Sequence, residues 1–325
     1  MEEMKKVVLI AVLFVFCLSA VFTFVACNDG EQLQIYVPDG APALSVAKLI
    51  DDGNIGSFKS NVTISTGEDV VAKCASGQTD IALLPTNAAV KVCSTRSDYL
   101  LFTTNVWGLL YVVGWSDVSS IAELSGKTVA SIGMGNTGEY LFKRVLDVNN
   151  VSYAENDGVT LKYVDDGTTA VSLLMQNKCE FALLGEPAAT NAINNAKANG
   201  KTLYRVFDLQ ALWKDVTGSS KTGYPQASVV VKRSLLERSG FADALYNALA
   251  ENKAYLAENV EKLGEVLQSA GSLLTVNYTA DIVSKCNINV VKACAIKQEI
   301  YDYLEQLGKQ FAQMLKDDLY YDFNG

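Results

Sequence analysis

Short apolar runs alternate with amphipathic helical patterns along most of the chain. The runs that predict strands are Leu33–Val37, Val62–Thr66, Asp80–Leu84, Tyr99–Thr103, Leu109–Val113, Thr128–Ile132, Leu161–Val164, Phe181–Leu184, Leu203–Val206 and Ser228–Val231. Helices are expected at Pro42–Ile50, around Asp69–Ala75 and from Thr86 onward. Alternating strands and helices favour parallel-rich sheets covered by helices on both faces. The pattern therefore predicts an α/β fold.

The segment from Phe241 to the end is predicted to be mostly helical. Its apolar residues recur at helical spacing, at Ile296, Ile300, Leu304, Leu307, Phe311 and Leu315. This spacing places them on one face of a helix, as is typical of packing against a core. We expect a helical C-terminal segment with a structural role.

One stretch of sequence occurs twice at an offset of 100 residues. Residues 67–89 read GEDVVAKCASGQTDIALLPTNAA and residues 167–189 read GTTAVSLLMQNKCEFALLGEPAA, with seven of 23 positions identical. The offset suits two lobes that each contain a helix, a strand, a sharp turn and another helix; chance similarity of two buried units is the alternative. Ligands of open α/β sheets bind beyond the carboxyl ends of strands. Pro85-Thr86-Asn87 and Gly185-Glu186-Pro187 are therefore predicted to face each other across a cleft.

Length and composition narrow the classes of function. A chain of 325 residues exceeds what one hydrophobic core usually serves, which also favours two lobes. The net charge of −9 opposes nucleic-acid binding, because phosphates require a basic patch. The chain has no histidine, which excludes imidazole metal sites and Ser-His or Cys-His catalysis. We find no catalytic constellation and expect no enzyme activity, cofactor or metal.

The N-terminus has the pattern of an export signal. Lys5 and Lys6 precede an apolar run over Val7–Ala26, which is followed by Cys27. The ending Phe-Val-Ala-Cys resembles the lipobox of bacterial lipoproteins, although Phe24 stands where Leu is usual. We predict a signal peptide over residues 1–26 and lipidation of Cys27; an uncleaved anchor helix is the alternative.

The seven cysteines are Cys17, Cys27, Cys74, Cys93, Cys179, Cys286 and Cys294. Five remain after removal of the signal and lipidation, so they cannot all pair within one chain. A disulfide between Cys286 and Cys294 is possible, but buried free thiols are the favoured interpretation.

Two turns carry candidate binding chemistry. Residues 133–138 read GMGNTG between a strand and a helix, but no acidic ribose partner follows, so a dinucleotide site is disfavoured. The glycines favour either close approach to an anionic or polar ligand group, or a tight turn alone. Glu186 either binds a ligand amine or ring N–H, or stabilises its own helix through the dipole. The candidates for stacking on a planar ligand are Tyr36, Trp107, Trp115 and Tyr224. For Trp115, packing at an interlobe crossing is the favoured interpretation.

The order of motifs resembles a known family. Behind Cys27 come VPDGAPALSVAKLI, GQTDIALLPTNAAV, SIAELSGKTVASIGMGNTGEYLFKRVL, CEFALLGEPAA and TGYPQASVVVKRSLLE. This order is similar to that of the solute-binding lipoproteins of ABC importers, in the nitrate/sulfonate/thiamine-precursor group. The resemblance covers nearly the whole mature chain.

The resemblance implies a type II periplasmic-binding-protein fold, with two α/β lobes joined by two crossover strands. The crossings are expected near Val113-Gly114-Trp115 and Tyr224-Pro225-Gln226. Lobe one would then contain residues 32–114 and 226–325, and lobe two residues 115–225. The implied ligand contacts are Gly40, Ala41, Pro42, Thr86, Asn87, Asn105, Trp107, Gly108, Asn136, Thr137 and Glu186.

The implied function is capture of a small polar or heterocyclic solute and its delivery to an ABC permease. The protein would be a monomer, lipid-anchored at the outer face of the bacterial cell membrane. None of the predicted turns holds His, Lys or Arg, which favours a neutral or cationic heterocycle over an anion. The alternatives are an enzyme of pyrimidine or menaquinone-precursor metabolism on the same fold, or a ligand-sensing lipoprotein. The pyrimidine-forming enzymes depend on a histidine that this chain lacks.

Overall fold

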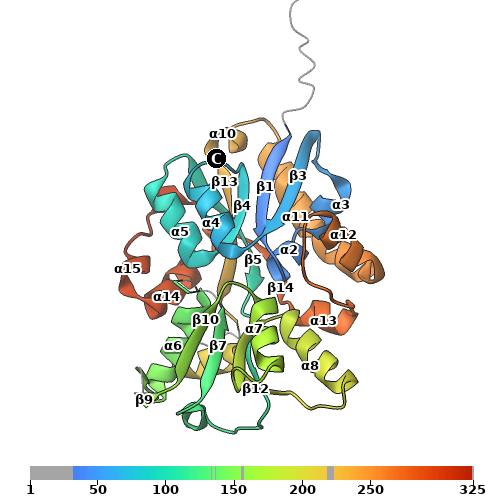
Figure 1. Ribbon diagram of the computed structural model, residues 1–325. Coiled ribbons are helices and arrows are strands. Elements are labelled where there is room, and N and C mark those ends of the chain that lie inside the picture. Colours follow the sequence, from blue (N-terminus) through green and yellow to red (C-terminus); the bar gives the residue numbers. More distant parts are fainter. Residues whose placement is uncertain (1–31, 133, 136, 155–156, 218–222, 324–325) are drawn as a thin grey trace, which may run out of the picture. The chain divides into compact units, whose positions relative to one another are not determined.

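The computed structural model describes residues 32–323, apart from residues 133, 136, 155–156 and 218–222 (Figure 1). Its described strands form two large sheets and one small one. The strand order is β14-β5-β13-β4-β1-β3-β2 in the first sheet and β10-β7-β11-β6-β12 in the second, while β8 pairs with β9. We call the first sheet with its helices lobe one, and the second sheet with its helices lobe two.

Lobe one is built from two separate stretches of the chain. Its strands are β1 (Leu33–Pro38), β2 (Asn54–Ile55), β3 (Phe58–Ser65), β4 (Ile81–Pro85), β5 (Tyr99–Trp107), β13 (Pro225–Lys232) and β14 (Ile288–Lys292). Its helices are α2 (Ala41–Leu44), α3 (Ala47–Asp52), α4 (Gly67–Ala75), α5 (Thr86–Thr95), α10 (Arg233–Leu236), α11 (Phe241–Glu258), α12 (Leu263–Ser269), α13 (Ala280–Lys285), α14 (Lys297–Leu307) and α15 (Lys309–Ala312). Short 3₁₀ turns lie at Val260–Lys262, Ala293–Ile296 and Asp317–Leu319.

Lobe two comes from the middle of the chain. Its strands are β6 (Leu110–Gly114), β7 (Thr128–Ile132), β8 (Tyr153–Ala154), β9 (Asp157–Gly158), β10 (Thr160–Val164), β11 (Phe181–Gly185) and β12 (Tyr204–Asp208). Its helices are α6 (Thr137–Val148), α7 (Gly167–Met175), α8 (Ala188–Ala198) and α9 (Leu209–Thr217), with a 3₁₀ turn at Ile121–Leu124. The predicted two-lobe α/β architecture is confirmed.

The repeated sequence is also a structural repeat. β4 pairs in parallel with β1, and β11 pairs in parallel with β7, so each copy lies inside a different sheet. The helix before each strand begins with the same kind of cap. Thr66 accepts a hydrogen bond from the Asp69 N–H (3.2 Å), and Asp166 accepts one from the Thr169 N–H (2.7 Å). Side-chain oxygens at this position satisfy N–H groups that the helix leaves free.

Hydrophobic packing explains why the repeated strands are so apolar. Leu83 and Leu183 belong to the main core, whereas Leu184 packs in a smaller core with Ala192 beneath α7 and α8. A strand that is buried on both faces needs apolar residues at successive positions rather than at alternating ones. The identical Ala-Leu-Leu of the two copies therefore reflects burial.

The first crossing differs from the sequence prediction. β6 pairs with β11 and β12 in the second sheet, with Tyr111 opposite Leu184. The chain therefore leaves lobe one at Gly108-Leu109, before the predicted Val113-Gly114-Trp115. The Trp115 indole donates to the Leu174 carbonyl within lobe two (2.9 Å) and does not lie at the crossing. β6 is buried along its whole length and would be equally apolar in either sheet. Hydrophobicity alone therefore could not predict to which sheet it belongs.

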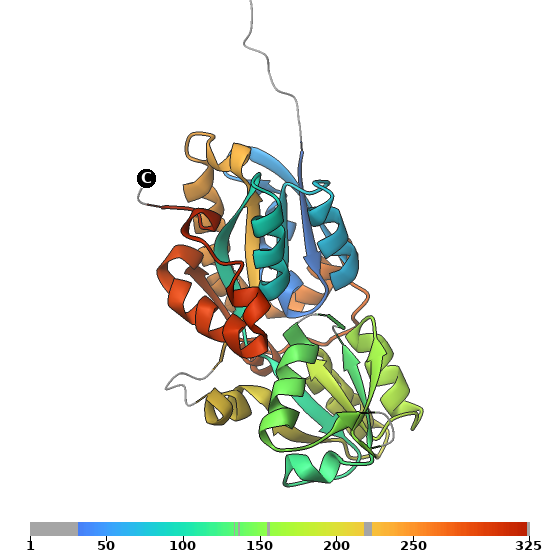
Figure 2. The ribbon, with the colours of Figure 1, turned by 90° about the vertical axis from the view of Figure 1, so that its left-hand side faces the viewer.

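The C-terminal segment contains a strand that the helical prediction missed. β14 pairs with β5 at the edge of the first sheet, and its β-branched Ile288, Val290 and Val291 suit a strand. The helices predicted from the later periodicity are present as α14 and α15, and α15 packs against α5 (Figure 2). Beyond them, the Tyr321 N–H donates to the Leu101 carbonyl of β5 (2.9 Å).

The five cysteines in the described part of the chain are free thiols: Cys74, Cys93, Cys179, Cys286 and Cys294. The possible Cys286–Cys294 disulfide is therefore absent. Burial raises the pKa of Cys74 to about 12, so this thiol stays protonated at neutral pH. Within the described residues, no helix is both long and apolar enough to cross a bilayer. The apolar run over Val7–Ala26, together with Cys17 and Cys27, lies outside them.

Candidate functional site

The predicted turns follow strands whose carboxyl ends lie on one side of each sheet. In lobe one, Gly40 comes after β1 and Thr86 after β4, and these two strands are parallel. In lobe two, Thr137 comes after β7 and Glu186 after β11, which are also parallel. This arrangement is the one expected of a ligand site in an open α/β sheet.

Asn87 and Thr137 join the two lobes directly. The Thr137 hydroxyl, in the first turn of α6, donates to Oδ1 of Asn87, in the first turn of α5 (3.1 Å). Both side chains are almost completely buried. α5 begins without a side-chain cap, because the residue before it is Pro85. Two predicted contact residues from different sheets are thus brought together.

Gly40 and Glu186 are also neighbours. A Cβ atom placed on Gly40 would lie 3.8 Å from the Glu186 carbonyl oxygen and 3.8 Å from Cδ of Pro187. Gly40 has φ of 92°, a conformation that a side chain disfavours. Gly40 therefore lies beside the turn after β11.

Hydroxyl groups line the start of α5 inside lobe one. The Thr86 hydroxyl lies 3.0 Å from that of Ser228, which lies 2.9 Å from that of Thr104. All three residues are fully buried. Each hydroxyl has a partner in this chain, so the cluster holds α5 against β5 and β13.

Asn105 has a free donor. It lies at a β-bulge, because Thr104 pairs with Ser228 and Val106 with the adjacent Ala227. The Thr103 hydroxyl donates to Asn105 Oδ1 (2.8 Å), but Nδ2 has no hydrogen-bond partner although the residue is fully buried. Bulges often redirect a side chain near a functional site, and unpaired buried polar groups are rare.

Trp107 and Gly108 lie at the first crossing. The Trp107 indole donates to the Asn289 carbonyl (2.8 Å). The Gly108 N–H donates to the Tyr224 carbonyl (3.0 Å), and a Cβ on Gly108 would come within 2.7 Å of Gln210 Cγ. The hydrogen bond between Gly108 and Tyr224 joins the two crossings to each other.

The Glu186 carboxylate is occupied by lobe two itself. It accepts hydrogen bonds from the Thr190 N–H (3.1 Å) and hydroxyl (2.9 Å), in the first turn of α8. It also pairs with Arg205 of β12, at 2.5 Å between Nη1 and Oε1. These contacts fit one of the two roles left open by the sequence, stabilisation of its own helix, in keeping with the helix dipole.

Sequence reasoning did not identify Arg205. Its guanidinium lies over the Tyr111 ring, 4.0 Å from the centroid, and donates to the Thr190 hydroxyl (2.7 Å). Arg205 is separated from Glu186 by a helix, and no motif links the two. The one available signal was a cation within a short strand-like run.

Glu139 plays a similar part at the glycine-rich turn. Its carboxylate accepts from the Gly135 N–H (2.6 Å) and the Tyr163 hydroxyl (2.6 Å), and it pairs with Lys143. Burial would raise the pKa of Glu139, but these hydrogen bonds outweigh it and lower the pKa below its usual value. Gly133 and Asn136 of the same turn lie outside the described residues.

An aromatic cluster connects the lobes behind these turns. Tyr224 stacks on Tyr303 of α14 with centroids 5.3 Å apart, and Trp213 of α9 meets both rings edge-on. Tyr140 of α6 similarly contacts Phe311 of α15. The Tyr224 ring is fully buried in this cluster, which opposes the hypothesis that it stacks on a ligand.

The structure also contains a cavity that lies away from the predicted turns. A cavity of about 220 Å³ lies between the carboxyl end of α5, Arg233 and Leu319, and none of the predicted site residues lines it. In the part of the chain that the structure describes, no group of three Cys, Asp or Glu residues is arranged to hold a metal ion.

Solved structures of other proteins have a similar architecture. A crystal structure described as an ABC transporter from Parabacteroides distasonis superposes with a TM-score of 0.72 at 18% identity, covering 90% of this chain and 100% of that one. The periplasmic aliphatic sulphonate binding protein SsuA from Escherichia coli gives 0.61 at 15% identity, covering 90% and 93%. A Candida albicans protein described as having the generic periplasmic-binding-protein fold gives 0.57 at 13% identity, covering 89% and 93%.

The chain has the periplasmic-binding-protein fold. No family model matches the sequence. A search of curated proteins also finds no match. At these identities the likeness shows the fold alone, and function has to be argued from the residues of this chain.

Proposed function

We propose that this protein is a solute-binding lipoprotein of an ABC importer, in the nitrate/sulfonate/thiamine-precursor group. It captures a small polar or heterocyclic solute between the lobes and delivers it to a permease. The hydrogen bond between Asn87 and Thr137 carries the proposal, because it joins strand ends of both sheets at the position where this fold binds ligands. The likeness to transport proteins supports it.

The proposed solute contacts are the turn over Gly40, Ala41 and Pro42, the residues Thr86, Asn87 and Asn105, and Asn136-Thr137. Trp107 and Gly108 hold the crossing beside the solute. Glu186 positions Arg205 and the start of α8. A solute that touches both lobes favours their closed arrangement through contacts that are absent when they separate.

A thermal-shift screen of small polar metabolites, followed by calorimetric titration, tests this proposal. Asn87→Ala is expected to weaken binding about ten-fold or more, the effect of about 1.4 kcal/mol. Asn194→Ala, at an exposed position of α8, is the matched control and should bind normally. If Asn87→Ala binds the solute with native affinity, Asn87 does not belong to the binding site. Conversion of the bound solute into a product would favour an enzyme instead.

The proposal includes export and lipid anchoring through Cys27. A single acyl chain binds a bilayer only marginally, so stable anchoring requires the several chains of a lipoprotein. Cys27→Ser should release the protein or leave the precursor uncleaved, as measured by intact mass and membrane fractionation. If Cys27→Ser keeps the native mass and stays in the membrane fraction, the anchor is the apolar run over Val7–Ala26.

A further inference from the structure

We infer that the solute is uncharged or cationic and carries a hydrogen-bond acceptor, and that it is not an oxyanion. This inference rests on the proposed function, since it names the class of solute for the same site. It follows from two sets of groups around the predicted turns: carboxylates that occupy backbone N–H groups, and buried donors that have no acceptor.

Three turns at the ends of strands already hold a carboxylate of this chain. Glu139 accepts from the Gly135 N–H after β7, and Glu186 accepts from the Thr190 N–H after β11. After β1, Asp39 accepts from the Gly40 N–H (2.8 Å). Free N–H groups at helix starts are the usual binding groups for phosphate and sulfonate oxygens. An oxyanion would meet a resident negative charge at each of these turns.

The nearby cations are committed to these carboxylates. Lys143 pairs with Glu139, and Arg205 pairs with Glu186. Asp39 is held instead by the Ser272 hydroxyl (2.7 Å) and the Leu273 N–H (2.9 Å). Among the described residues, no Lys or Arg forms an ion pair with Asp39. The three turns together are therefore neutral to negative, which disfavours a second anion.

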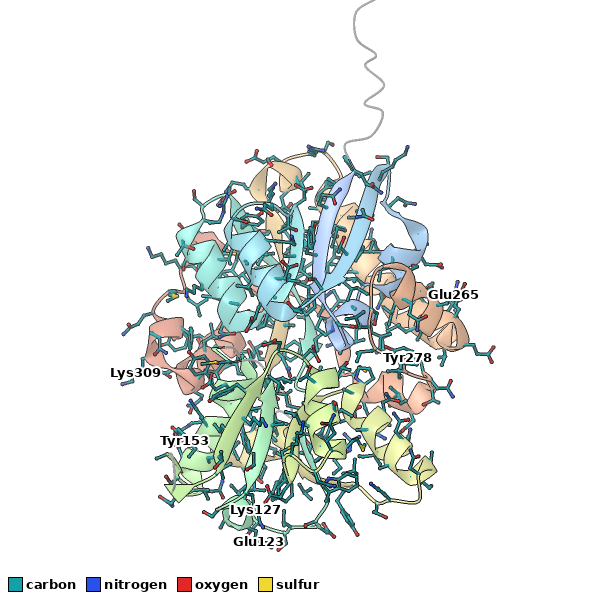
Figure 3. The ribbon with its side chains drawn as sticks, viewed as in Figure 1. Glu123, Lys127, Tyr153, Glu265, Tyr278 and Lys309 are labelled. Carbon is teal, nitrogen blue, oxygen red and sulfur yellow. The ribbon has the colours of Figure 1, made fainter. Side chains whose placement is uncertain are left out.

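Several buried donors in the described residues lack a hydrogen-bond acceptor, and two of them lie near these turns without belonging to the aromatic cluster or to an ion pair. One is Nδ2 of Asn105, on β5, the strand against which α2 packs. The other is the hydroxyl of Tyr278, on the segment that precedes α13 (Figure 3). Burial raises the pKa of Tyr278, and the nearby Asp39 carboxylate raises it further, so the phenol keeps its proton.

A solute acceptor would satisfy these donors. A buried donor without a partner is unfavourable, so a carbonyl oxygen or ring nitrogen placed there gains a hydrogen bond at low desolvation cost. Such an acceptor is uncharged, which agrees with the resident carboxylates. The shared fold with a sulfonate-binding protein does not oppose this, because ligand class depends on the residues at the strand ends.

The test compares three sets of probes by thermal melting and calorimetry of the full chain in detergent. The anions are ethanesulfonate, methylphosphonate and nitrate, the uncharged probes nicotinamide and cytosine, and the cation N-methylnicotinamide, all at matched ionic strength. We expect an uncharged or cationic probe to raise Tm by about 5 °C near saturation. The shift should disappear in Asn105→Leu, and the anions should give none.

The outcomes separate the inference from the proposed function. An anion that raises Tm in the native chain but not in Asn105→Leu would overturn the inference and leave solute binding intact. Absence of a shift with every probe would contradict solute binding, and the inference with it.

A second variant tests the resident carboxylate without any solute. Glu139→Ala leaves the Gly135 N–H, Lys143 and the Tyr163 hydroxyl without their acceptor. We expect added acetate to recover at least half of the lost Tm in this variant, and nothing in Glu265→Ala, an exposed control on α12 (Figure 3). No recovery would overturn the inference that this turn is an anion position filled by the chain. If Glu139→Ala does not fold, the anion titrations of the native chain still decide.

Discussion

The two repeated units have the same elements but use their turns differently. β4 and β11 occupy the same positions within the repeat, at Ile81–Pro85 and Phe181–Gly185. After β4, the chain enters α5 at once, and Asn87 reaches across to the other lobe. After β11, Glu186 turns back to its own helix. Buried apolar residues make the two strands alike, whereas the polar residues that follow them differ: Asn87 bonds to the other lobe and Glu186 to its own helix.

The largest expected difference between the two turns is in folding stability. Glu186→Ala should lower the free energy of unfolding by about 3 kcal/mol, because it leaves Arg205 without its buried partner; the partial exposure of Arg205 keeps the effect at the low end of such losses. Urea unfolding measures the change. Glu186→Gln, which keeps an acceptor for Thr190, should lose less. A loss below about 1 kcal/mol in Glu186→Ala would contradict the inward role.

The stability of the turn before α6 should depend on pH, because the Glu139 carboxylate holds this turn. The folded-state pKa of Glu139 lies below its unfolded value of about 4.3, so its stabilisation is present above that pH and is lost as pH falls through the folded pKa. Glu139→Gln should therefore be less stable than the native chain by about 1.5–3 kcal/mol at pH 7. The gap should narrow on acidification below about pH 4. An equal gap at pH 7 and pH 3, measured by urea unfolding, would rule out this origin.

The N-terminal caps of α4 and α7 occupy the same position in the two repeated units. We expect them to contribute equally to the free energy of unfolding. Thr66→Ala and Asp166→Ala should each lower the free energy of unfolding by about 1 kcal/mol, since each loses one hydrogen bond to a helix N–H. Thermal melts of both variants provide the comparison. A clear loss in one variant and none in the other would show that the two caps are not equivalent.

The smallest expected effect concerns the contact between lobes. A double-mutant cycle with Asn87→Ala and Thr137→Val should give a coupling energy of about 0.5 kcal/mol in the absence of solute, the value of one neutral hydrogen bond. Chemical denaturation of the four proteins measures it. Purely additive effects would mean that this hydrogen bond does not stabilise the lobes together.

The sequence predicted the positions of the turns better than the contacts made there. The placement of Gly40, Asn87, Thr137 and Glu186 after their strands follows from the alternation of apolar runs and helices. The occupation of Glu186 by Arg205 does not, because the pair depends on β12 lying next to β6 in the second sheet. The strand order of a sheet is a long-range property that no local pattern encodes.

The boundary of lobe one shows the same limit. The strand predicted at Leu109–Val113 is present as β6, but its sheet was not predicted, since both sheets offer the same apolar surroundings. β14 was missed because a five-residue strand within a helical segment gives a weak period. The bulge at Asn105 likewise depends on the register with β13, which only the paired strands define.

The sequence by itself determined the alternation of strands and helices, the repeat, the absence of histidine chemistry and the α/β class, since these depend on local spacing and composition. Tertiary structure alone decided which charges meet and which donors stay unpaired. Glu139, Glu186 and Asp39 are ordinary acidic residues in the sequence, and Asn105 and Tyr278 are ordinary polar ones. Folding gives the three carboxylates backbone N–H partners and buries Asn105 Nδ2 and the Tyr278 hydroxyl without an acceptor. These N–H partners lie within four residues of each carboxylate. The other partners, Arg205 of Glu186, Tyr163 of Glu139 and Ser272 of Asp39, come from distant parts of the chain, and only packing brings such residues together.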